Sequence, residues 1–204
     1  TAGATEALFC AIAAVVHAGD EVIVLDPAYD SYDPVIRLQG AVPVHVSLMA
    51  PAYRIDWDRI EAAITANTRL LILNSPHNPT GMVMDESDIA ALSALCAKYD
   101  IYLIGDEVYE HMVFDQAKHL SLCGYAELYA RSFVISSFGK TYHVTGWKVG
   151  YCVAPPALTK ELRRLHQYVT FTVNTPVQLG IADFLQQHPE HHQQLPAFYQ
   201  AKRD

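Results

Sequence analysis

An α/β fold with three layers, a parallel sheet between two layers of helices, is predicted by two features of this sequence. Short apolar runs rich in β-branched residues alternate with segments of helical periodicity, which is the pattern of a doubly wound sheet. The chain has 204 residues, of which 51% are hydrophobic. That is enough for one domain with a substantial core.

Six apolar runs are predicted to be strands. Their apolar residues follow one another without a regular polar alternation, so both faces of each strand are expected to be buried between helix layers. The sixth run lies close behind the fifth. The six predicted strands are 21–27, 42–48, 70–76, 101–108, 132–138 and 149–155.

Helices are predicted in the gaps between these strands. The first helix, over residues 4–18, ends before Gly19, a residue suited to the position after a helix C-terminus. Asp56 and Asp85 are expected to cap two further helices, because a carboxylate accepts hydrogen bonds from the free N–H groups of a first turn. The remaining helices are expected over residues 56–66, 85–99, 157–170, 175–187 and from His192 onward.

Charge and composition exclude several classes of partner. The formal net charge is −8, with Lys and Arg scattered along the chain, so nucleic acid is not an expected partner. The longest apolar run, residues 7–16, is too short to span a bilayer, so no membrane association is expected. The four cysteines lie far apart, which predicts reduced thiols of a cytoplasmic protein.

A chemically distinctive stretch follows the fifth predicted strand, where residues 136–141 read S-S-F-G-K-T. Lys140 would emerge at the carboxyl edge of the sheet, where open α/β sheets bind their ligands. A lone lysine at a strand end is more often an ordinary surface residue. A phosphate-binding Walker loop would need a glycine at position 134, but that residue is Val134, so this alternative fails.

A second lysine, Lys148, lies eight residues after Lys140 in the stretch G-W-K-V-G. Together with Ser137, the two lysines form an S-x-x-K motif followed by a further basic residue. This pattern resembles the Schiff-base lysine motif of the fold type I aminotransferases (class I/II), which use pyridoxal 5'-phosphate (PLP). The resemblance implies that Lys140 forms the imine with PLP, while Ser137 and Lys148 bind its phosphate. A lysine amine condenses with an aldehyde, and Lys148 would supply a point charge.

The fourth predicted strand ends in Asp106-Glu107-Val108-Tyr109. A carboxylate beside a pyridine nitrogen favours the protonated ring, which is a better electron sink. The resemblance implies this role for Asp106, and it implies that Tyr109 donates a hydrogen bond to the phenolate oxygen of the ring. Taken alone, the acidic pair could equally cap a helix or belong to a Walker-B motif.

Asn78 and Tyr29 follow two other predicted strands. Asn78 opens N-P-T-G, which alone is a good type I turn. In the fold type I aminotransferases that this chain resembles, the turn presents the Asn amide to the same phenolate oxygen. The X-Pro bond of the turn is often cis in that family. Tyr29 ends D-P-A-Y and matches the aromatic residue that stacks on the pyridine ring. Taken alone, Tyr29 could equally be a core tyrosine.

The sixth matching position is the start of the first helix, residues 3–8 (G-A-T-E-A-L). Free N–H groups at a helix N-terminus attract phosphate. The resemblance implies contacts from Ala4 and Thr5, although Glu6 could equally compensate the helix dipole.

The resemblance covers essentially the whole chain, with the matching residues in the same order. It implies a mostly parallel sheet with one antiparallel strand, and it implies that residues 1–204 are most of the PLP-binding large domain. The N-terminal arm with the first strand, and the C-terminal small domain with the arginine that binds the substrate carboxylate, would then lie outside this sequence. A homodimer is also implied.

Within the family, the stretches D-P-A-Y-D-S-Y-D-P and H-Q-Y-V-T-F-T-V-N-T-P look closest to the methionine and kynurenine aminotransferase branch. The implied activity is transamination between an amino acid with a methionine, aromatic or other large apolar side chain and a 2-oxo acid. A PLP-dependent C–S lyase and the sensor domain of a transcription regulator remain alternatives. The histidines of residues 188–192 are predicted to mark a solvated helix boundary, and no metal site is expected.

Overall fold

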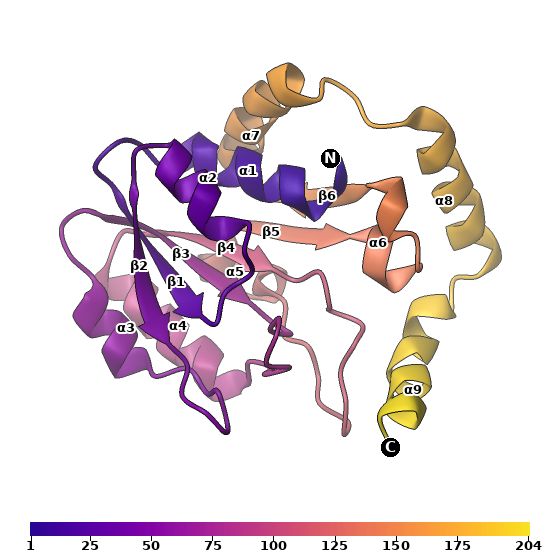
Figure 1. Cartoon of the computed structure of the whole chain (residues 1–204), viewed down its shortest axis with the longest axis horizontal. Helices are drawn as coiled ribbons and strands as arrows, with labels where there is room; N and C mark the ends of the chain where they lie inside the picture. Colours follow the sequence, from indigo (N-terminus) through magenta and orange to yellow (C-terminus); the bar gives the residue numbers. More distant parts are fainter.

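The computed structural model describes residues 1–204 and has three layers, with one six-stranded sheet in the middle (Figure 1). The strand order is β2-β1-β3-β4-β5-β6. The first five strands are parallel, and the last strand pairs with β5 in the antiparallel direction. The expected sheet is therefore confirmed. The strands are β1 (Glu21–Asp26), β2 (Val42–Ser47), β3 (Thr68–Asn74), β4 (Tyr102–Asp106), β5 (Ser132–Ser137) and β6 (Gly150–Val153).

Nine α-helices and two short 3-10 helices, η1 and η2, connect the strands. Helices α1, α2 and α7 cover one face of the sheet, whereas α3, α4 and α5 cover the other (Figure 1). The helices are α1 (Gly3–Val15), α2 (Tyr32–Leu38), α3 (Trp57–Ala63), α4 (Glu86–Lys98), η1 (Leu122–Gly124), α5 (Ala126–Tyr129), α6 (Phe138–Thr141), η2 (Thr145–Trp147), α7 (Pro156–Val169), α8 (Thr175–Gln187) and α9 (His191–Arg203).

Each face of the sheet has its own apolar core. Fully buried strand residues such as Val24 and Ile72 pack under α1, while their neighbours Ile23 and Leu71 pack under α4. This alternation buries both faces of the central strands, which explains why these segments read as nearly continuous apolar runs.

The predicted helix caps are present. The Asp56 side chain accepts a hydrogen bond from the backbone N–H of Arg59, and Asp85 accepts from Ser87 and Asp88 in a capping box. The ends of the helices differ from the expectation by a few residues. The first helix stops at Val15 because Val16 is already extended, and Gly19 with its φ of +89° lies in the following turn.

Three helices were not predicted, namely α2, α5 and α6, and their lengths explain this. They contain seven, four and four residues, which is too short to show a helical periodicity. Helices α8 and α9 lie to the side of the sheet, beyond α6 (Figure 1).

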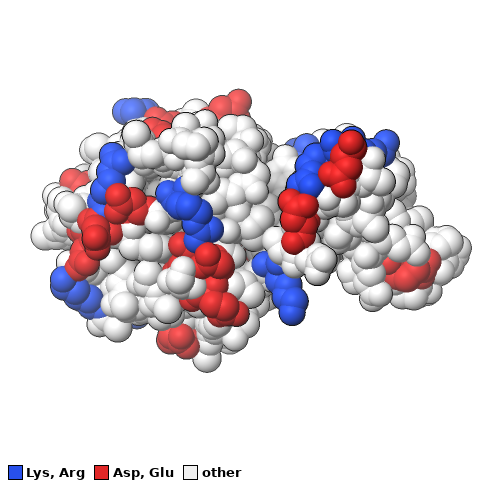
Figure 2. All heavy atoms as spheres, turned by 90° about the horizontal axis from the view of Figure 1, so that it is seen from below, with Lys and Arg blue, Asp and Glu red and all other residues white.

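On the face of the molecule shown in Figure 2, neither positive nor negative side chains predominate. Lys and Arg side chains lie beside Asp and Glu side chains in small groups there (Figure 2). None of the helices combines the length and the apolar character needed to cross a membrane.

Candidate active site

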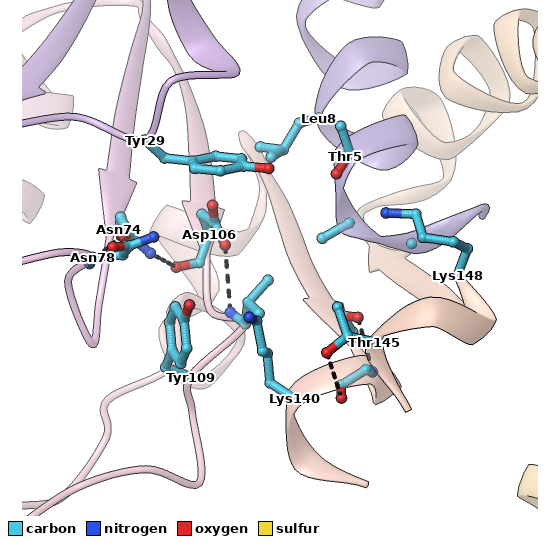
Figure 3. Close-up of a pocket in the computed structure, with 15 residues that line it drawn as sticks. Thr5, Leu8, Tyr29, Asn74, Asn78, Asp106, Tyr109, Lys140, Thr145 and Lys148 are labelled. Atoms are coloured by element: carbon cyan, nitrogen blue, oxygen red, sulfur yellow. Dashed lines mark hydrogen bonds between the residues drawn. The ribbon is translucent and has the colours of Figure 1, made fainter. Parts of the chain in front are cut away.

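One cavity lies at the carboxyl edge of the sheet, where the ends of β1, β3, β4 and β5 meet the N-terminus of α1 (Figure 3). All nine residues predicted as site residues line it, which means that separate strand ends and turns converge on one place. The structure thus brings the predicted set together, while the role of each residue stays a prediction. The lining residues are Gly3, Ala4, Thr5, Leu8, Tyr29, Asn74, Asn78, Asp106, Val108, Tyr109, Ser137, Gly139, Lys140, Thr145 and Lys148.

Asp106 lies at the end of β4 and is buried. Burial raises the pKa of its carboxyl to about 6, although hydrogen bonds from Tyr32 and from the Val108 backbone act in the lowering direction. The Tyr32 hydroxyl donates to Oδ2 at 2.6 Å. Asp106 is therefore a carboxyl group held in one orientation, and its charge would be stabilised further by a cation in the cavity.

Tyr32 is a residue that the sequence reading missed. It begins α2, is buried, and packs edge-to-face against Tyr29 with ring centroids 5.6 Å apart. Burial, and next the negative charge of Asp106, raise the pKa of Tyr32 well above its ordinary value, so the hydroxyl keeps its proton and remains a donor. The spacing of the two tyrosines in D-P-A-Y-D-S-Y was the available signal, but it is informative only once a helix is recognised there.

Asn74 is the second residue that the sequence reading missed. Its side chain is buried at the end of β3 and donates to the backbone carbonyl of Asp106 at 2.8 Å. Its Oδ1 accepts from the backbone N–H of Asn78 at 2.7 Å. The Asn78–Pro79 bond is cis, as the resemblance implies. Asn74 therefore links the turn that carries Asn78 to the strand that carries Asp106.

Lys140 lies on the short helix α6, directly after β5. The Ser137 side chain caps this helix by accepting from the backbone N–H of Gly139 at 3.0 Å. Lys140 Nζ lies 5.7 Å from the centroid of the Tyr109 ring (Figure 3). No side-chain hydrogen bond or ion pair involves the amine of Lys140. An unpaired amine in a cavity beside a buried carboxyl group is suited to covalent chemistry.

Lys148 lies at the opposite end of the cavity, next to the N-terminus of α1. A Cβ placed on Gly3 would lie 3.0 Å from Lys148 Nζ, so this amine sits close to the helix start. The side-chain amine of Lys148 also forms no hydrogen bond or ion pair. A cation beside the positive end of a helix dipole is unfavourable unless an anion joins them, so this end of the cavity suits a phosphate.

Glu6 does not oppose this charge from within the cavity. Its carboxylate accepts from the backbone N–H of Ala2 and contacts Nδ1 of His166 on α7 at 2.6 Å. Glu6 therefore serves the first turn of α1 and the contact with α7.

The position of the α1 N-terminus depends on a close backbone approach to β6. The Thr1 carbonyl accepts from the backbone N–H of Gly150 at 3.0 Å. A Cβ on Gly150 would lie 2.7 Å from the carbonyl carbon of Gly3 and 2.8 Å from the nitrogen of Ala4. Only a glycine permits this contact, because both opposing atoms belong to the backbone.

Gly150→Ala is consequently expected to destabilise the protein by about 1–3 kcal/mol, the usual effect of overpacking, and to displace the start of α1. Urea unfolding followed by circular dichroism would measure the change. Gly146→Ala is the matched control, because a Cβ there meets nothing within 4 Å. Equal stability of the two variants would contradict this account of the close approach.

One group of potential metal ligands lies outside the cavity. Suitable atoms of Glu107, Glu110 and His119 lie within 4.8 Å of one another. The two carboxylates already have protein partners: Glu107 contacts His119 Nε2 at 2.9 Å, and Glu110 accepts a hydrogen bond from the Tyr151 hydroxyl at 3.0 Å. We therefore assign these side chains to holding the segment after β4 against the sheet.

The helix boundary predicted at residues 188–192 is confirmed, since α8 ends at Gln187 and α9 begins at His191. His191 is only half-exposed, however. Its ring stacks on Tyr142, and its Nε2 lies 2.9 Å from the carbonyl oxygen of Thr141.

Comparison with known proteins identifies the family. A family model, aminotransferase class I and II, matches residues 1–204. The chain belongs to this family. Class I and II aminotransferases use PLP, so the cavity described above lies in a fold that is built around this cofactor.

The predicted branch of the aminotransferases is also confirmed. Methionine aminotransferase of Escherichia coli (strain K12) is 53% identical over 204 residues, which are 100% of this chain and 53% of that protein. Kynurenine–oxoglutarate transaminase 3 of Homo sapiens is 38% identical over 192 residues, which cover 89% of this chain and 42% of that protein. The chain spans about half the length of the curated relatives it matches.

A solved aminotransferase structure has nearly the same fold. YbdL from Escherichia coli, whose structural report identifies a methionine aminotransferase function, matches with a TM-score of 0.97 and 53% identity. The match covers 100% of this chain and 54% of that chain.

Proposed function

We propose that this protein transfers the amino group of methionine, or of an amino acid with a comparably large apolar or aromatic side chain, to a 2-oxo acid with the help of PLP. The observation that carries the proposal is the convergence of the unpaired amine of Lys140 with the buried carboxyl group of Asp106 in one cavity. The identity of 53% to a methionine aminotransferase supports the choice of substrate class.

The residues at both ends of the cavity fit PLP. A dianionic phosphate would lie at the N-terminus of α1, with Ala4, Thr5, Ser137 and Lys148 around it. At the other end, Asp106 would face the pyridine nitrogen. A cofactor with one anionic end and one end that gains from a nearby carboxylate matches this distribution of charge.

Three side chains would orient the ring between these ends. Tyr29 offers an aromatic face above it, while the Asn78 amide and the Tyr109 hydroxyl are donors that suit its phenolate oxygen. All three lie on different loops, so the ring would be held from several directions.

When bound, PLP supplies an aldehyde that condenses with amines and a ring that accepts electrons. Lys140 would provide the amine that holds the cofactor and, once released by substrate, the base that moves the Cα proton. Asp106 would stabilise positive charge at the ring nitrogen, with Tyr32 holding the carboxylate in place through its 2.6 Å hydrogen bond.

We also propose that residues 1–204 are most of the large domain of a longer homodimeric protein. The match to about half of each relative supports this division. The arginine for the substrate carboxylate would then belong to the small domain. Large apolar side chains exposed at the end of α7 and on α8, with Tyr168 at 85%, Phe171 at 73% and Leu179 at 62%, support an interface on that side.

A product assay on the full-length protein with PLP tests the proposed function. With methionine and a 2-oxo acid acceptor, we expect the 2-oxo acid of methionine and the amino acid derived from the acceptor in equal amounts. Without a 2-oxo acid acceptor, we expect one equivalent of the 2-oxo acid of methionine per PLP site. Ammonia with a released thiol would instead indicate a C–S lyase. Cofactor binding without turnover of any amino acid would contradict the enzymatic proposal.

A further inference from the structure

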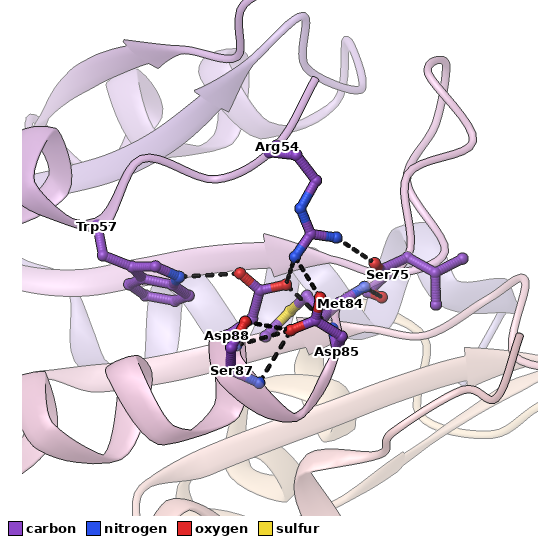
Figure 4. Close-up of polar contacts among 8 residues, drawn as sticks. Arg54, Trp57, Ser75, Met84, Asp85, Ser87 and Asp88 are labelled. Carbon is purple, nitrogen blue, oxygen red and sulfur yellow. Dashed lines mark hydrogen bonds and ion pairs between the residues drawn. The ribbon is translucent and has the colours of Figure 1, made fainter. Parts of the chain in front are cut away.

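Arg54 lies outside the cavity, in the segment between β2 and α3, yet it contacts the loop that carries Asn78 (Figure 4). Its Nη1 donates to the backbone carbonyl of Val83 at 3.1 Å. Its Nη2 contacts the carboxylates of Asp85 at 2.7 Å and Asp88 at 2.6 Å. One guanidinium group thus joins the returning leg of the loop to the N-terminus of α4.

Asp88 is the fixed point of this arrangement. Its side chain is only 4% exposed and belongs to the first turn of α4. Besides Arg54, it accepts from the indole N–H of Trp57 at 3.0 Å and from the backbone N–H of Asp85 at 3.0 Å (Figure 4). A carboxylate with three separate donors has little freedom to move, so Arg54 is anchored on a rigid element.

Within the loop, only a few hydrogen bonds separate the Arg54–Val83 contact from Asn78. The Met82 carbonyl, next to Val83, accepts from the backbone N–H of His77 at 2.8 Å and so closes the loop. His77 directly precedes Asn78. On the other leg of the loop, Asn74 holds the Asn78 backbone. The loop is therefore fastened on one side to β3. On the returning leg it is held by Arg54 at Val83 and, one residue on, by the hydrogen bond that the Met84 backbone N–H donates to the Ser75 hydroxyl at 3.0 Å.

We propose that Arg54 is a positioning residue that holds the amide of Asn78 toward the cofactor ring by fixing the loop through Val83. This inference rests on the proposed function, because Asn78 needs a cofactor to act upon. Arg54 suits the task because its planar guanidinium donates in fixed directions to several acceptors at once, which a lysine amine does not reproduce.

The exposure of these side chains indicates that Arg54 does more than stabilise the fold. The Arg54 side chain is 44% exposed and Asp85 is 55% exposed, so the ion pair between them contributes little to stability. The pair with Asp88 contributes more, because the Asp88 carboxylate is only 4% exposed. Without Arg54, Asp88 keeps the donors from Trp57 and Asp85. Loss of Arg54 should therefore loosen the loop more than it destabilises the fold.

The test is a double-mutant cycle of Arg54→Gln and Asn78→Ala in the full-length protein loaded with PLP. The pKa of the visible chromophore is measured by pH titration of its absorbance. An amide that donates to the phenolate oxygen favours the oxygen's anionic form, so Asn78→Ala should raise this pKa by up to about one unit, the worth of one hydrogen bond. Arg54→Gln should shift it in the same direction.

The expected signature is the loss of the Arg54→Gln shift once Asn78→Ala is present, because Arg54 would act only through that amide. Trp57→Phe is the matched control, since it removes a donor from Asp88 without touching Val83, and it should leave the pKa unchanged. An Arg54→Gln shift that persists undiminished in the Asn78→Ala background, or no shift at all, would overturn the inference.

A second readout needs no cofactor. Hydrogen exchange in the PLP-free protein should become about tenfold faster at the amides of residues 77–84 in Arg54→Gln, and not in Trp57→Phe. Unchanged exchange there would also overturn the inference. If wild-type protein gives no chromophore with PLP, the proposed function fails, whereas this exchange experiment still decides whether Arg54 holds the loop.

Discussion

Lys140→Ala is expected to abolish transamination, with turnover falling by about 10⁴-fold or more, and to remove the visible absorption band of PLP joined covalently to the protein. A positioned general base contributes up to about 10⁴-fold, and in this protein the same amine would also hold the cofactor. Folding should be unaffected, because Lys140 is half-buried and its amine forms no side-chain hydrogen bond or ion pair. Absorbance spectra and steady-state kinetics of the full-length protein measure both effects.

Lys148→Ala is the comparison that separates attachment from phosphate binding. It removes a cation at the other end of the cavity and leaves Lys140 in place, so the band should persist at saturating PLP. The affinity for PLP should fall by about 10–100-fold, as expected for a hydrogen bond to a charged group. If the band survives in Lys140→Ala and disappears in Lys148→Ala, the two assignments are reversed.

Asp106→Asn is expected to reduce turnover by several orders of magnitude and, in the PLP-free protein, to increase stability at neutral pH. The amide cannot carry the negative charge that stabilises a protonated ring nitrogen. The amide oxygen still accepts from Tyr32, and the variant no longer has a carboxyl group to ionise in a buried site.

The pH dependence of stability follows from the pKa of Asp106, which is about 6 in the folded protein against an ordinary value of 3.8. Below pH 3.8 the carboxyl is protonated in the folded and the unfolded protein, so it does not lower the free energy of unfolding. Between these values the folded protein binds more protons than the unfolded chain, so stability falls as the pH rises. Above pH 6 the free energy of unfolding has fallen by its full amount, which is about 3 kcal/mol.

Thermal unfolding of PLP-free protein between pH 4 and pH 7.5 measures this effect. The wild-type protein should lose stability relative to Asp106→Asn as the pH rises, and the two curves should converge near pH 4. Parallel curves over this range would mean that burial does not raise the pKa of Asp106.

Much of the fold follows from local features of the sequence. All six strands were predicted within a few residues, because a strand buried on both faces must be apolar throughout, as in residues 70–73. The caps at Asp56 and Asp85 were predictable because a carboxylate before a helix satisfies free N–H groups wherever the helix lies. Helices α2, α5 and α6 were not predicted, since seven, four and four residues are too few to show a helical periodicity.

The candidate site residues were predicted through the resemblance to the family, because each position taken alone could equally be a surface, turn, cap or core residue. Lys140, Asp106 and Asn78 come from different strand ends, and a parallel sheet places such ends along one edge.

Only the tertiary structure decided how these residues are supported. The Tyr32–Asp106 hydrogen bond joins residues 74 positions apart, and Arg54 contacts Val83 across 29 positions. No local pattern encodes such pairs, because they depend on how the helices and loops close over the sheet. The pKa of Asp106 is likewise a property of its burial. The sequence by itself determined which groups reach the cavity, whereas their orientation and proton affinity arise from packing between distant segments.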